Sequence, residues 1–399
     1  MFDIHDRIHI SAGLPCVSVL PFSRIINQMS LDLSKEKDPN LLQYGFSSGY
    51  PRFKRILANF IGGKERRILN PENLFITNGA THGILLSIIS LSGGRASVIM
   101  ERPTYFPMID LFKELNLSLH FADMDSEGIS VDMILSHLRT IPHEENVFIH
   151  VTPFFQNPTG VCMSKDRARK LVEIIKENKN TWLLVDNVYK YLNFAEIEYD
   201  DILSKDLGRI INIGSFSKIF GPGVRLGWIE AEKSVIEKIS ESGYVQSSGG
   251  FNPISARLME GIIQNQDMNM IIEIWVKFLK RKQKELVTEL RDIFPKSSFR
   301  TPAGGYYIWT DLKEDLIADD KFRQFAKDKK GIVFVPGIKC AGDSNHFRTY
   351  LRFGFATYKD DELITGIKKL KEAIIEFNAS GHSALGHTIN LPNESTGRK

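Results

Sequence analysis

The sequence lacks the features that define several broad classes of protein. Its 399 residues contain three cysteines, Cys16, Cys162 and Cys340, an odd number without the spacing of metal ligands. We therefore expect reduced thiols in a cytoplasmic protein, with neither a disulfide framework nor a metal site. The first residues lack the basic and apolar segments of a signal peptide. Apolar runs such as residues 85–91 are too short to cross a bilayer, so we expect a soluble protein without a membrane partner.

An excess of charge of one sign is lacking as well. Lysine and arginine number 51, and aspartate and glutamate number 48. This near balance does not favour nucleic acid or a membrane surface as a partner, and a small metabolite fits better. The chain also lacks internal repeats and low-complexity segments. Hydrophobic residues make up 42% of it, enough for one large core and a smaller second unit.

Short apolar segments with the pattern of buried strands alternate with helical patterns along the chain. Such strands are predicted at residues 74–77, 98–101, 147–152, 182–185, 210–213 and 226–229. This alternation indicates an α/β protein with a mostly parallel sheet. Ligand sites in open α/β sheets lie at the carboxyl ends of the strands, so the residues after each strand are the first candidates for a site.

Residues 214–228 form the most informative of these segments, Gly-Ser-Phe-Ser-Lys-Ile-Phe-Gly-Pro-Gly-Val-Arg-Leu-Gly-Trp. The amine of Lys218 could form a Schiff base with an aldehyde cofactor. Ser215, Ser217 and Arg225 could hold the phosphate of that cofactor. A solvated basic loop after a strand would have a similar composition, so this segment does not decide the matter alone.

Three other strand ends carry side chains suited to an aromatic cofactor. Asn157, held extended by the proline after it, has a neutral amide that can donate to a phenolate oxygen. Asp186 ends a buried strand and could pair with a protonated pyridine nitrogen, and Tyr189 lies three positions on. The ring of Tyr105 could stack on a pyridine ring.

Two further segments are suited to anion binding. Ala80 and Thr81 follow a strand and open an apolar helix, and the free N–H groups of a helix N-terminus can hold a phosphate. We interpret His82 beside them as structural. Arg352, within Leu351-Arg-Phe-Gly-Phe-Ala, could bind a carboxylate with two parallel hydrogen bonds. The alternative is an arginine on the solvent face of an edge strand.

Taken together, these segments resemble the fold-type I aminotransferases of class I/II, which use pyridoxal 5'-phosphate (PLP). The resemblance runs from about residue 9 to about residue 375 and is to the branch of aminoadipate and kynurenine aminotransferases. It rests on Ser-Phe-Ser-Lys…Pro-Gly-Val-Arg-Leu-Gly-Trp, Asn-Pro-Thr-Gly and Glu-x-Pro-Thr-Tyr. It implies the PLP-dependent transferase fold of type I, a large domain with a mostly parallel seven-stranded sheet flanked by helices and a small α+β domain.

The resemblance also assigns roles to single residues. Lys218, Asp186 and Tyr105 are the catalytic residues that it implies. The PLP site is expected to comprise Tyr44, Ala80, Thr81, Tyr105, Asn157, Asp186, Tyr189, Ser215, Ser217, Lys218 and Arg225. Gly13, Asn157 and Arg352 are expected beside the substrate. Because the family's counterpart of Tyr44 contacts the cofactor of the neighbouring subunit, a homodimer with shared active sites is implied.

The organisation of the chain follows from the same reading. We expect residues 1–40 to form an irregular N-terminal arm that contributes to the small domain. Residues 41–275 would form the large PLP-binding domain and residues 276–378 the small domain, with an amphipathic helix at residues 271–290 between them. Residues 244–252 are predicted to be a loop. Residues 379–399 are polar and predicted to be a disordered tail.

The function that the resemblance implies is transfer of the amino group of an L-amino acid to a 2-oxo acid, through a Lys218 aldimine and a pyridoxamine form. The same scaffold carries carbon-sulfur lyases, cyclopropane-forming synthases and amino-acid oxidases, and the sequence leaves these open. Asn187, Cys340 and the Tyr306-Tyr307 pair depart from the commonest family residues, which leaves the side-chain preference open. Similar domains in transcription regulators follow a DNA-binding module, which this sequence is not expected to have. A catalytically inert relic is expected to have lost Lys218 or Asp186.

Overall fold

The computed structural model describes residues 7–197, 202–205, 208–343 and 346–380. Apart from residues 379 and 380, the predicted tail lies outside these ranges. None of the described helices combines the length and apolar character needed to cross a membrane.

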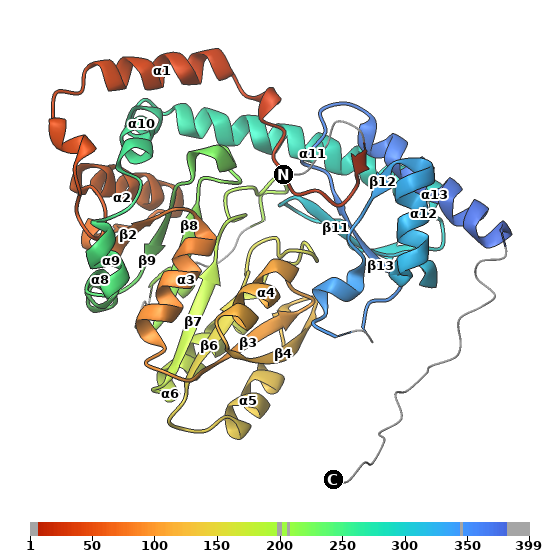
Figure 1. Ribbon diagram of the computed structural model, residues 1–399, viewed down its shortest axis with the longest axis horizontal. Helices are drawn as coiled ribbons and strands as arrows, with labels where there is room; N and C mark the ends of the chain where they lie inside the picture. Colours follow the sequence, from red (N-terminus) through yellow and green to blue (C-terminus); the bar gives the residue numbers. More distant parts are fainter. Residues whose placement is uncertain (1–6, 198–201, 206–207, 344–345, 381–399) are drawn as a thin grey trace, which may run out of the picture.

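The larger sheet has eight strands (Figure 1). In spatial order they are β2 (Leu74–Thr77), β9 (Gly227–Glu230), β8 (Ile210–Ser215), β7 (Thr181–Asp186), β6 (Asn146–Val151), β3 (Ala96–Arg102), β4 (Ser118–Asp125) and β5 (Gly128–Ile129). Strand β9 is antiparallel to both neighbours and β5 folds back on β4, whereas the remaining neighbours are parallel. The α/β fold with a mostly parallel sheet is therefore confirmed, and the two-residue β5 adds an eighth strand to the seven expected.

Helices cover both faces of this sheet. Helices α3 (Ala80–Leu91), α4 (Phe106–Glu114) and α8 (Lys233–Ser240) pack on one face, and α5 (Val131–Thr140), α6 (Lys165–Glu177) and α7 (Ile202–Lys205) on the other. Strand β3 illustrates this division. Val98 and Met100 belong to the apolar core on the face of α3, α4 and α8, and Ile99 belongs to the core on the face of α5, α6 and α7. Successive side chains of a strand point to opposite faces, so a strand covered on both sides is apolar throughout.

A smaller sheet lies at the other end of the molecule. Strand β11 (Tyr307–Asp311) pairs in antiparallel fashion with β10 (Ser298–Phe299) and β13 (Tyr350–Gly354). Strand β1 (Ile8–His9) of the N-terminal arm pairs in parallel with β12 (Ile332–Val333). Helices α12 (Asp320–Lys330) and α13 (Glu362–Ala379) pack beside these strands (Figure 1). The beginning of the chain therefore lies against its last third.

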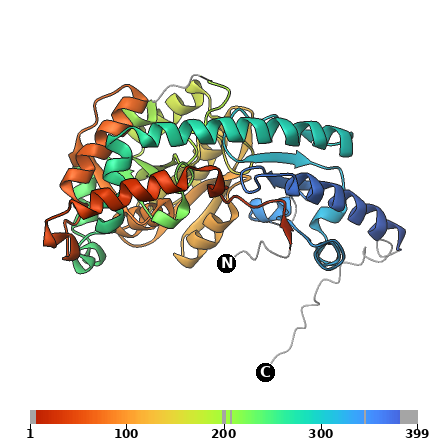
Figure 2. The ribbon, with the colours of Figure 1, turned by 90° about the horizontal axis from the view of Figure 1, so that it is seen from above.

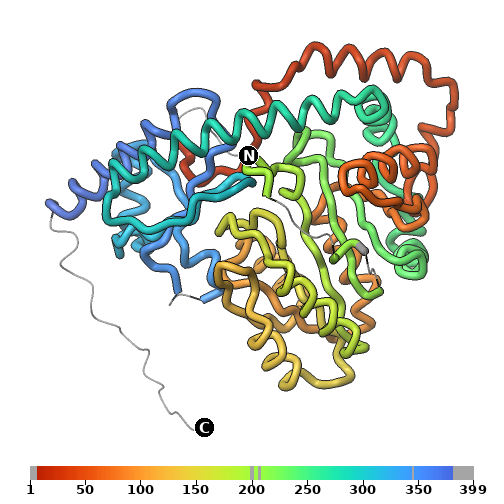
Figure 3. The backbone as a smooth tube through the Cα atoms, turned by 180° about the vertical axis from the view of Figure 1, so that it is seen from behind, coloured from red at the N-terminus to blue at the C-terminus, as the bar shows by residue number. Residues whose placement is uncertain are grey.

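Helix α11 (Asp267–Ile293) joins the two ends of the molecule. It runs from α10 (Pro253–Gln264) to the smaller sheet as one long rod (Figure 2), and the view from behind shows the same course (Figure 3). The amphipathic helix predicted at residues 271–290 is thus present and longer. Trp275, Phe278 and Leu279 lie on its buried face.

Two predictions about irregular segments were wrong. The arm contains the 13-residue helix α1 (Phe22–Ser34), which packs against α10 (Figure 1). Its apolar residues do recur at helical spacing, but only Ile25 is buried, so the pattern lacks a continuous core-facing stripe. Residues 244–252 include α9 (Gly243–Ser248), a short helix that forms despite its serines because Val245 packs into the core.

The remaining helices are short, apart from α2 (Pro51–Glu65), whose Pro51 occupies the first turn as expected. They are the 3-10 helices η1 (Val17–Val19), η2 (Pro39–Leu42), η3 (Pro71–Asn73), η4 (Pro222–Val224), η5 (Asp315–Ala318) and η6 (Gly337–Cys340).

Candidate active site

One cavity of about 530 Å³ lies at the carboxyl ends of β3, β6, β7 and β8. Residues 11–14 of the arm, β12 and β13 supply its other walls. Its lining includes all but one of the predicted site residues, namely Gly13, Ala80, Thr81, Tyr105, Asn157, Asp186, Tyr189, Ser215, Ser217, Lys218, Arg225 and Arg352. Tyr44 is the exception. The fold therefore gathers side chains from positions 13 to 352 into one space.

Lys218 follows β8, and its amine points into this cavity. Its Nζ donates a hydrogen bond to the carbonyl oxygen of Gly13 at 2.9 Å, and the hydroxyl of Tyr306 donates to the carbonyl of Lys218 at 2.7 Å. Burial lowers the pKa of the Lys218 amine. A lowered pKa favours the neutral amine, the form that attacks a carbonyl carbon.

Gly13 allows the arm to approach this closely. A Cβ atom at Gly13 would lie 1.6 Å from the hydroxyl oxygen of Tyr307, a distance that no side chain could accept. The backbone carbonyl of Gly13 can therefore reach Lys218 only because the residue has no side chain.

Asp186 is the last residue of β7, next to β8 in the sheet. Its Oδ1 accepts the N–H of Val188 at 3.2 Å. Burial raises the pKa of Asp186 to about 6, and the nearby Lys218 opposes this rise. A carboxyl group held close to neutrality responds strongly to any positive charge brought beside it.

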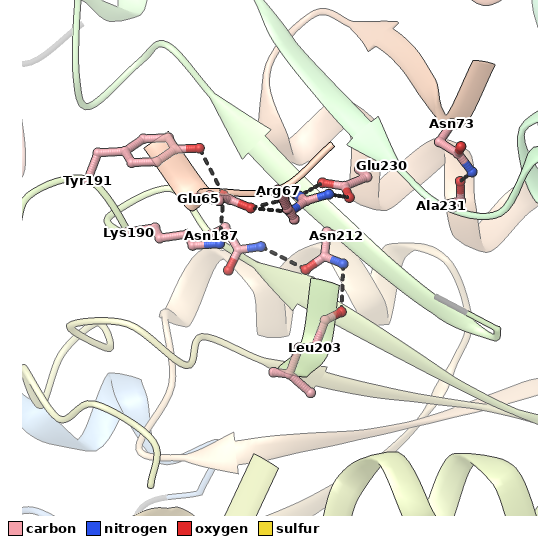
Figure 4. Close-up of polar contacts among 10 residues, drawn as sticks. All are labelled: Glu65, Arg67, Asn73, Asn187, Lys190, Tyr191, Leu203, Asn212, Glu230 and Ala231. Atoms are coloured by element: carbon pink, nitrogen blue, oxygen red, sulfur yellow. Dashed lines mark hydrogen bonds and ion pairs between the residues drawn. The ribbon is translucent and has the colours of Figure 1, made fainter. Parts of the chain in front are cut away.

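The side chain of Asn187 does not line the cavity. Its Nδ2 donates to Asn212 Oδ1 on β8 at 2.9 Å, and Asn212 Nδ2 donates to the carbonyl of Leu203 at 2.9 Å (Figure 4). The Asn187 amide thus belongs to a chain of neutral hydrogen bonds.

A buried charged cluster fixes the loop that carries Tyr189. Glu65, at the end of α2, accepts hydrogen bonds from Lys190 Nζ at 2.7 Å and from the Tyr191 hydroxyl at 3.0 Å (Figure 4). Arg67 joins Glu65 to Glu230 of β9. Its Nη2 lies 2.7 Å from Glu65 Oε2, and its Nη1 lies 2.7 Å from Glu230 Oε1. Both residues that follow Tyr189 are therefore anchored to α2.

Arg352 of β13 reaches across the cavity from the smaller sheet. Its Nη1 donates to Asn157 Oδ1 at 2.8 Å and its Nη2 to the carbonyl of Ser11 at 3.0 Å. Its guanidinium lies 4.3 Å from the centre of the Tyr307 ring. Its Nε is buried and finds no hydrogen-bond partner among the described residues. Asn157 Nδ2 in turn lies 3.5 Å from the Tyr189 hydroxyl.

The N-terminus of α3 forms another part of the cavity lining. Its N-cap residue, Gly79, has φ +100° and gives no side-chain cap, so the first N–H groups of Ala80 and Thr81 are left for another acceptor. Ser215 Oγ and Ser217 Oγ lie 2.9 Å apart on the loop beside it. Arg225 completes this group, since its Nη2 donates to the carbonyl of Asn78 at 2.8 Å.

His82 has a packing role at this helix. Its Nδ1 accepts the N–H of Asn78 at 3.0 Å, and its ring centre lies 4.5 Å from that of Phe251. Burial and the charge of Arg225 lower the pKa of His82 to about 4. The ring therefore stays neutral at physiological pH, in line with its structural interpretation.

Tyr105 lies at the N-terminal end of α4, and burial raises the pKa of its hydroxyl to about 12. Sequence reasoning missed several other cavity residues, namely His9, Ser11, Phe106, Thr152, Tyr307 and Phe334. His9 and Ser11 lie in the irregular arm, where no periodicity marks a residue as facing a site. Tyr307 was noticed only as a departure from relatives, and its contact with Arg352 has no local signal in the sequence.

Tyr44 lies outside the cavity. It follows η2, and 79% of its surface is exposed. It packs on the glycine-rich turn after α9, where a Cβ atom at Gly249 would lie 2.7 Å from its ring. Within a single chain it therefore has no contact with the site.

The groups in the cavity fit PLP. The uncapped helix end, two hydroxyls and a guanidinium suit a phosphate dianion, and a buried amine and a buried carboxyl lie at neighbouring strand ends. The mixed sheet with its site at the strand ends, together with the smaller sheet, defines the fold-type I aminotransferase fold. The model of the family "Aminotransferase class I and II" matches residues 16–370, and the chain belongs to this family, which is PLP-dependent.

Relatives of two kinds resemble the chain. It is 27% identical to aromatic-amino-acid aminotransferase 1 of Thermococcus litoralis, over 94% of this chain and 90% of that protein. It is 26% identical to the HTH-type transcriptional regulator NorG of Staphylococcus aureus, over 83% of this chain and 73% of the regulator. Similarity in sequence therefore extends to both enzymes and regulators.

Solved structures agree with the predicted branch. The kynurenine aminotransferase of Pyrococcus horikoshii, solved in complex with PMP, superposes with a TM-score of 0.80 at 25% identity, over 93% of this chain and 91% of that one. The α-aminoadipate aminotransferase LysN of Thermus thermophilus has the same fold, with a TM-score of 0.80 at 22% identity over 94% of each chain.

Proposed function

We propose that the protein is a PLP-dependent aminotransferase that moves the amino group of an L-amino acid to a 2-oxo acid. One observation carries the proposal: Lys218, Asp186 and Arg352 line a single cavity whose lining also includes the uncapped N-terminus of α3. An amine, an acid and a carboxylate-binding fork are the three groups that the reaction requires of the protein.

The residues at each end of the cavity would hold PLP. The N–H groups of Ala80 and Thr81, with Ser215, Ser217 and Arg225, would bind the phosphate. Lys218 would bind the cofactor through Nζ, and Asp186 would pair with the pyridine nitrogen. When bound, PLP supplies an electron sink for the negative charge that develops at the substrate Cα.

The chain's own residues would do the rest. Arg352 would bind the α-carboxylate through Nε, which has no partner among the described residues, and an adjacent Nη. Tyr307 beneath the guanidinium would fix its plane. The amino acid would first displace Lys218 from the cofactor. As a neutral amine, Lys218 would then take the proton from the substrate Cα and deliver it to C4′ of the cofactor.

We further propose a homodimer with shared active sites. Several large apolar side chains are exposed on α1, on residues 42–46, on α9 and on α10, namely Phe22, Ile26, Leu42, Tyr44, Phe46, Tyr244 and Ile254. Apolar patches of this kind are typical of protein interfaces. A second copy covering them would place Tyr44 against a neighbour's cavity. The three free cysteines support a cytoplasmic location.

A regulator is the second candidate, because NorG, at 26% identity, is nearly as similar to this chain as the aromatic-amino-acid aminotransferase of Thermococcus litoralis, at 27%. Such a protein would bind PLP and an amino acid without completing the transfer. Lyase and oxidase chemistry would also begin from the same residues.

The test is a half-reaction. The purified protein, loaded with PLP, is mixed with single L-amino acids without an oxo acid, while absorbance, ammonia and oxygen are followed together. An aminotransferase converts PLP to pyridoxamine phosphate and releases neither ammonia nor hydrogen peroxide. Ammonia release without oxygen uptake would indicate a lyase, oxygen uptake an oxidase, and a spectral change without any conversion a regulator.

A further inference from the structure

We infer that Glu101 and Gln156 are positioning residues, which fix the loop carrying Tyr105 relative to the loop carrying Asn157. Neither side chain lines the cavity, so both act through their neighbours. The inference rests on the proposed PLP site, because Tyr105 and Asn157 are two of the groups expected to contact the cofactor ring.

Glu101 lies in β3, one residue before its end, and is fully buried. Its Oε1 accepts the N–H of Thr152 at 3.2 Å, and its Oε2 accepts Nε2 of Gln156 at 3.0 Å. Thr152, the residue after β6, itself lines the cavity. The carboxyl group therefore ties the ends of two adjacent strands together.

Gln156 uses every hydrogen-bonding position of its amide. Besides Glu101, its Nε2 donates to the carbonyl of Pro103 at 2.8 Å. Its Oε1 accepts both the N–H of Thr159 at 2.9 Å and the hydroxyl of Thr159 at 2.7 Å. An amide offers two donors and two acceptor positions, so its orientation is fully determined.

The hydrogen bonds of Gln156 lie close to site residues on two segments. Pro103 lies two residues before Tyr105, and Gln156 is directly followed by Asn157. Asn157 then accepts Nη1 of Arg352. A shift of the Gln156 amide would therefore displace Tyr105 and Asn157, which are expected to contact the cofactor ring. Through Asn157 it would also displace Arg352.

Burial of the Glu101 carboxyl group costs desolvation free energy, so this group is expected to have a structural or functional role. Burial raises the pKa of Glu101 to about 8, and the neighbouring Asp186 adds to the rise. Other groups that face Glu101 are neutral hydrogen-bond donors, Thr152 and Gln156. An apolar residue would fill the same place in the core without this desolvation cost, but could not hold two loops in register.

The first test exchanges donor and acceptor. Gln156→Glu removes both Nε2 donors, and Glu101→Gln sets an N–H against another N–H, so each single variant should bind PLP about tenfold more weakly. The double variant Glu101→Gln with Gln156→Glu restores a donor facing an acceptor and should recover part of that affinity. A double variant that is as weak as the product of the singles would overturn the inference.

The matched control is Ser97→Ala. Ser97 lies at the start of the same strand, where its buried hydroxyl donates to Glu145 at 2.7 Å. Its loss should lower stability without changing PLP affinity or the pH dependence of the bound-PLP absorbance. Should Ser97→Ala weaken PLP as much as Gln156→Glu does, the effect is general destabilisation and the inference is wrong.

A second cycle tests whether Gln156 acts through Asn157. In an Asn157→Ala background, Gln156→Glu should change the bound-PLP absorbance much less than in the wild type, since the group that transmits the change is gone. Equal changes in both backgrounds would contradict the inference. If Gln156→Glu fails to fold, Thr159→Val removes the hydroxyl that donates to Gln156 and accepts the N–H of Val161, and it should give a smaller shift of the same kind.

Amide hydrogen exchange of the apoprotein separates this inference from the proposed function. Gln156→Glu should speed exchange at Thr152 and Thr159, and Ser97→Ala should not. If the wild type binds no PLP, the proposed function fails, and this exchange still decides whether the cluster holds the two loops. Equal exchange in both variants would overturn the inference even in a protein that binds PLP.

Discussion

At the scale of single residues, burial brings an amine and an acid toward their neutral forms in one cavity. It lowers the pKa of Lys218 and raises the pKa of Asp186 to about 6. Another buried amine is that of Lys54, whose pKa is also lowered by burial and whose Nζ donates to Ser48 at 2.8 Å. Only Lys218 lines the cavity, and this difference makes the two lysines a matched pair for experiment.

Borohydride reduction of the PLP-loaded protein should attach the cofactor to Lys218 alone. Lys218→Ala should abolish the label, because no other amine in the described chain lines the cavity, and Lys54→Met should retain it. Peptide mapping by mass spectrometry gives the answer. A label on any lysine other than Lys218 would refute the assignment.

Arg352→Lys should weaken substrate capture and leave the cofactor untouched. A point charge cannot replace two parallel hydrogen bonds, so KM for the amino acid should rise about 10- to 100-fold while the bound-PLP absorbance stays the same. Arg348→Lys, on the exposed segment before β13, is the control and should leave KM unchanged. An unchanged KM in Arg352→Lys would place the carboxylate elsewhere.

The raised pKa of Glu101 predicts a pH-dependent stability. In the folded chain Glu101 holds its proton up to about pH 8, whereas its ordinary value is near 4.5. Its contribution to stability is therefore complete below pH 4.5 and is lost as the pH rises to 8. Glu101→Gln should be less stable than the wild type at pH 5, with a difference that shrinks toward pH 8 in urea unfolding of the apoprotein. For Asp186→Asn, the stability difference from the wild type should vary with pH only below about pH 6. A Glu101→Gln difference that stays constant with pH would show that Glu101 is ionised in the folded chain.

At the scale of elements, the segments with polar residues directly after a buried strand were the most predictable. The predicted strands containing or preceding Tyr105, Asn157, Asp186 and Lys218 are all present, and the four residues meet because the strands are neighbours in the sheet. Local pattern could not reveal α1, because most of its apolar side chains are not buried against the described part of the chain. Nor could it reveal the Arg352–Tyr307 stack or the Glu101–Gln156 bond, since each joins segments whose separation in space depends on the whole fold.

Gly79→Ala should disturb the anion-binding end of α3. The φ of +100° strains any residue with a side chain by about 1–3 kcal/mol, and the new Cβ would lie 3.1 Å from Arg225 Nη2. Weaker PLP binding is expected together with lower stability. Gly94→Ala has the same kind of strain at φ +135° but meets open space, so it should lower stability alone. Isothermal titration with PLP and urea unfolding distinguish the two, and equal PLP affinity in both variants would exclude α3 as the phosphate site.

At the scale of the whole molecule, the exposed apolar surface around Tyr44 predicts shared sites. Tyr44→Ala and Lys218→Ala proteins should each be weakly active, and mixing them after mild dissociation should restore about a quarter of the wild-type activity, because half of the dimers then carry one intact site of two. Sedimentation measures the assembly state. A fully active monomer, or mixing without recovery, would contradict the shared site.

We also propose that residues 41–275 and 276–378 form the two domains, with residues 1–40 joining the second. The pairing of β1 with β12 supports the place of the arm. The proposed boundary falls inside α11, so the helix would belong to both domains and carry motion from one to the other.

The arm's contacts have a consequence for the order of synthesis. The carbonyl of Gly13 accepts a hydrogen bond from Lys218, and the carbonyl of Ser11 accepts one from Arg352. Strand β1 pairs with β12, which is made much later. Strand β1 must therefore wait, unpaired, until β12 has been made. A nascent chain that already contains Lys218 and Asp186 still lacks the walls that β12 and β13 supply, so the cavity is complete only after β13 has been made.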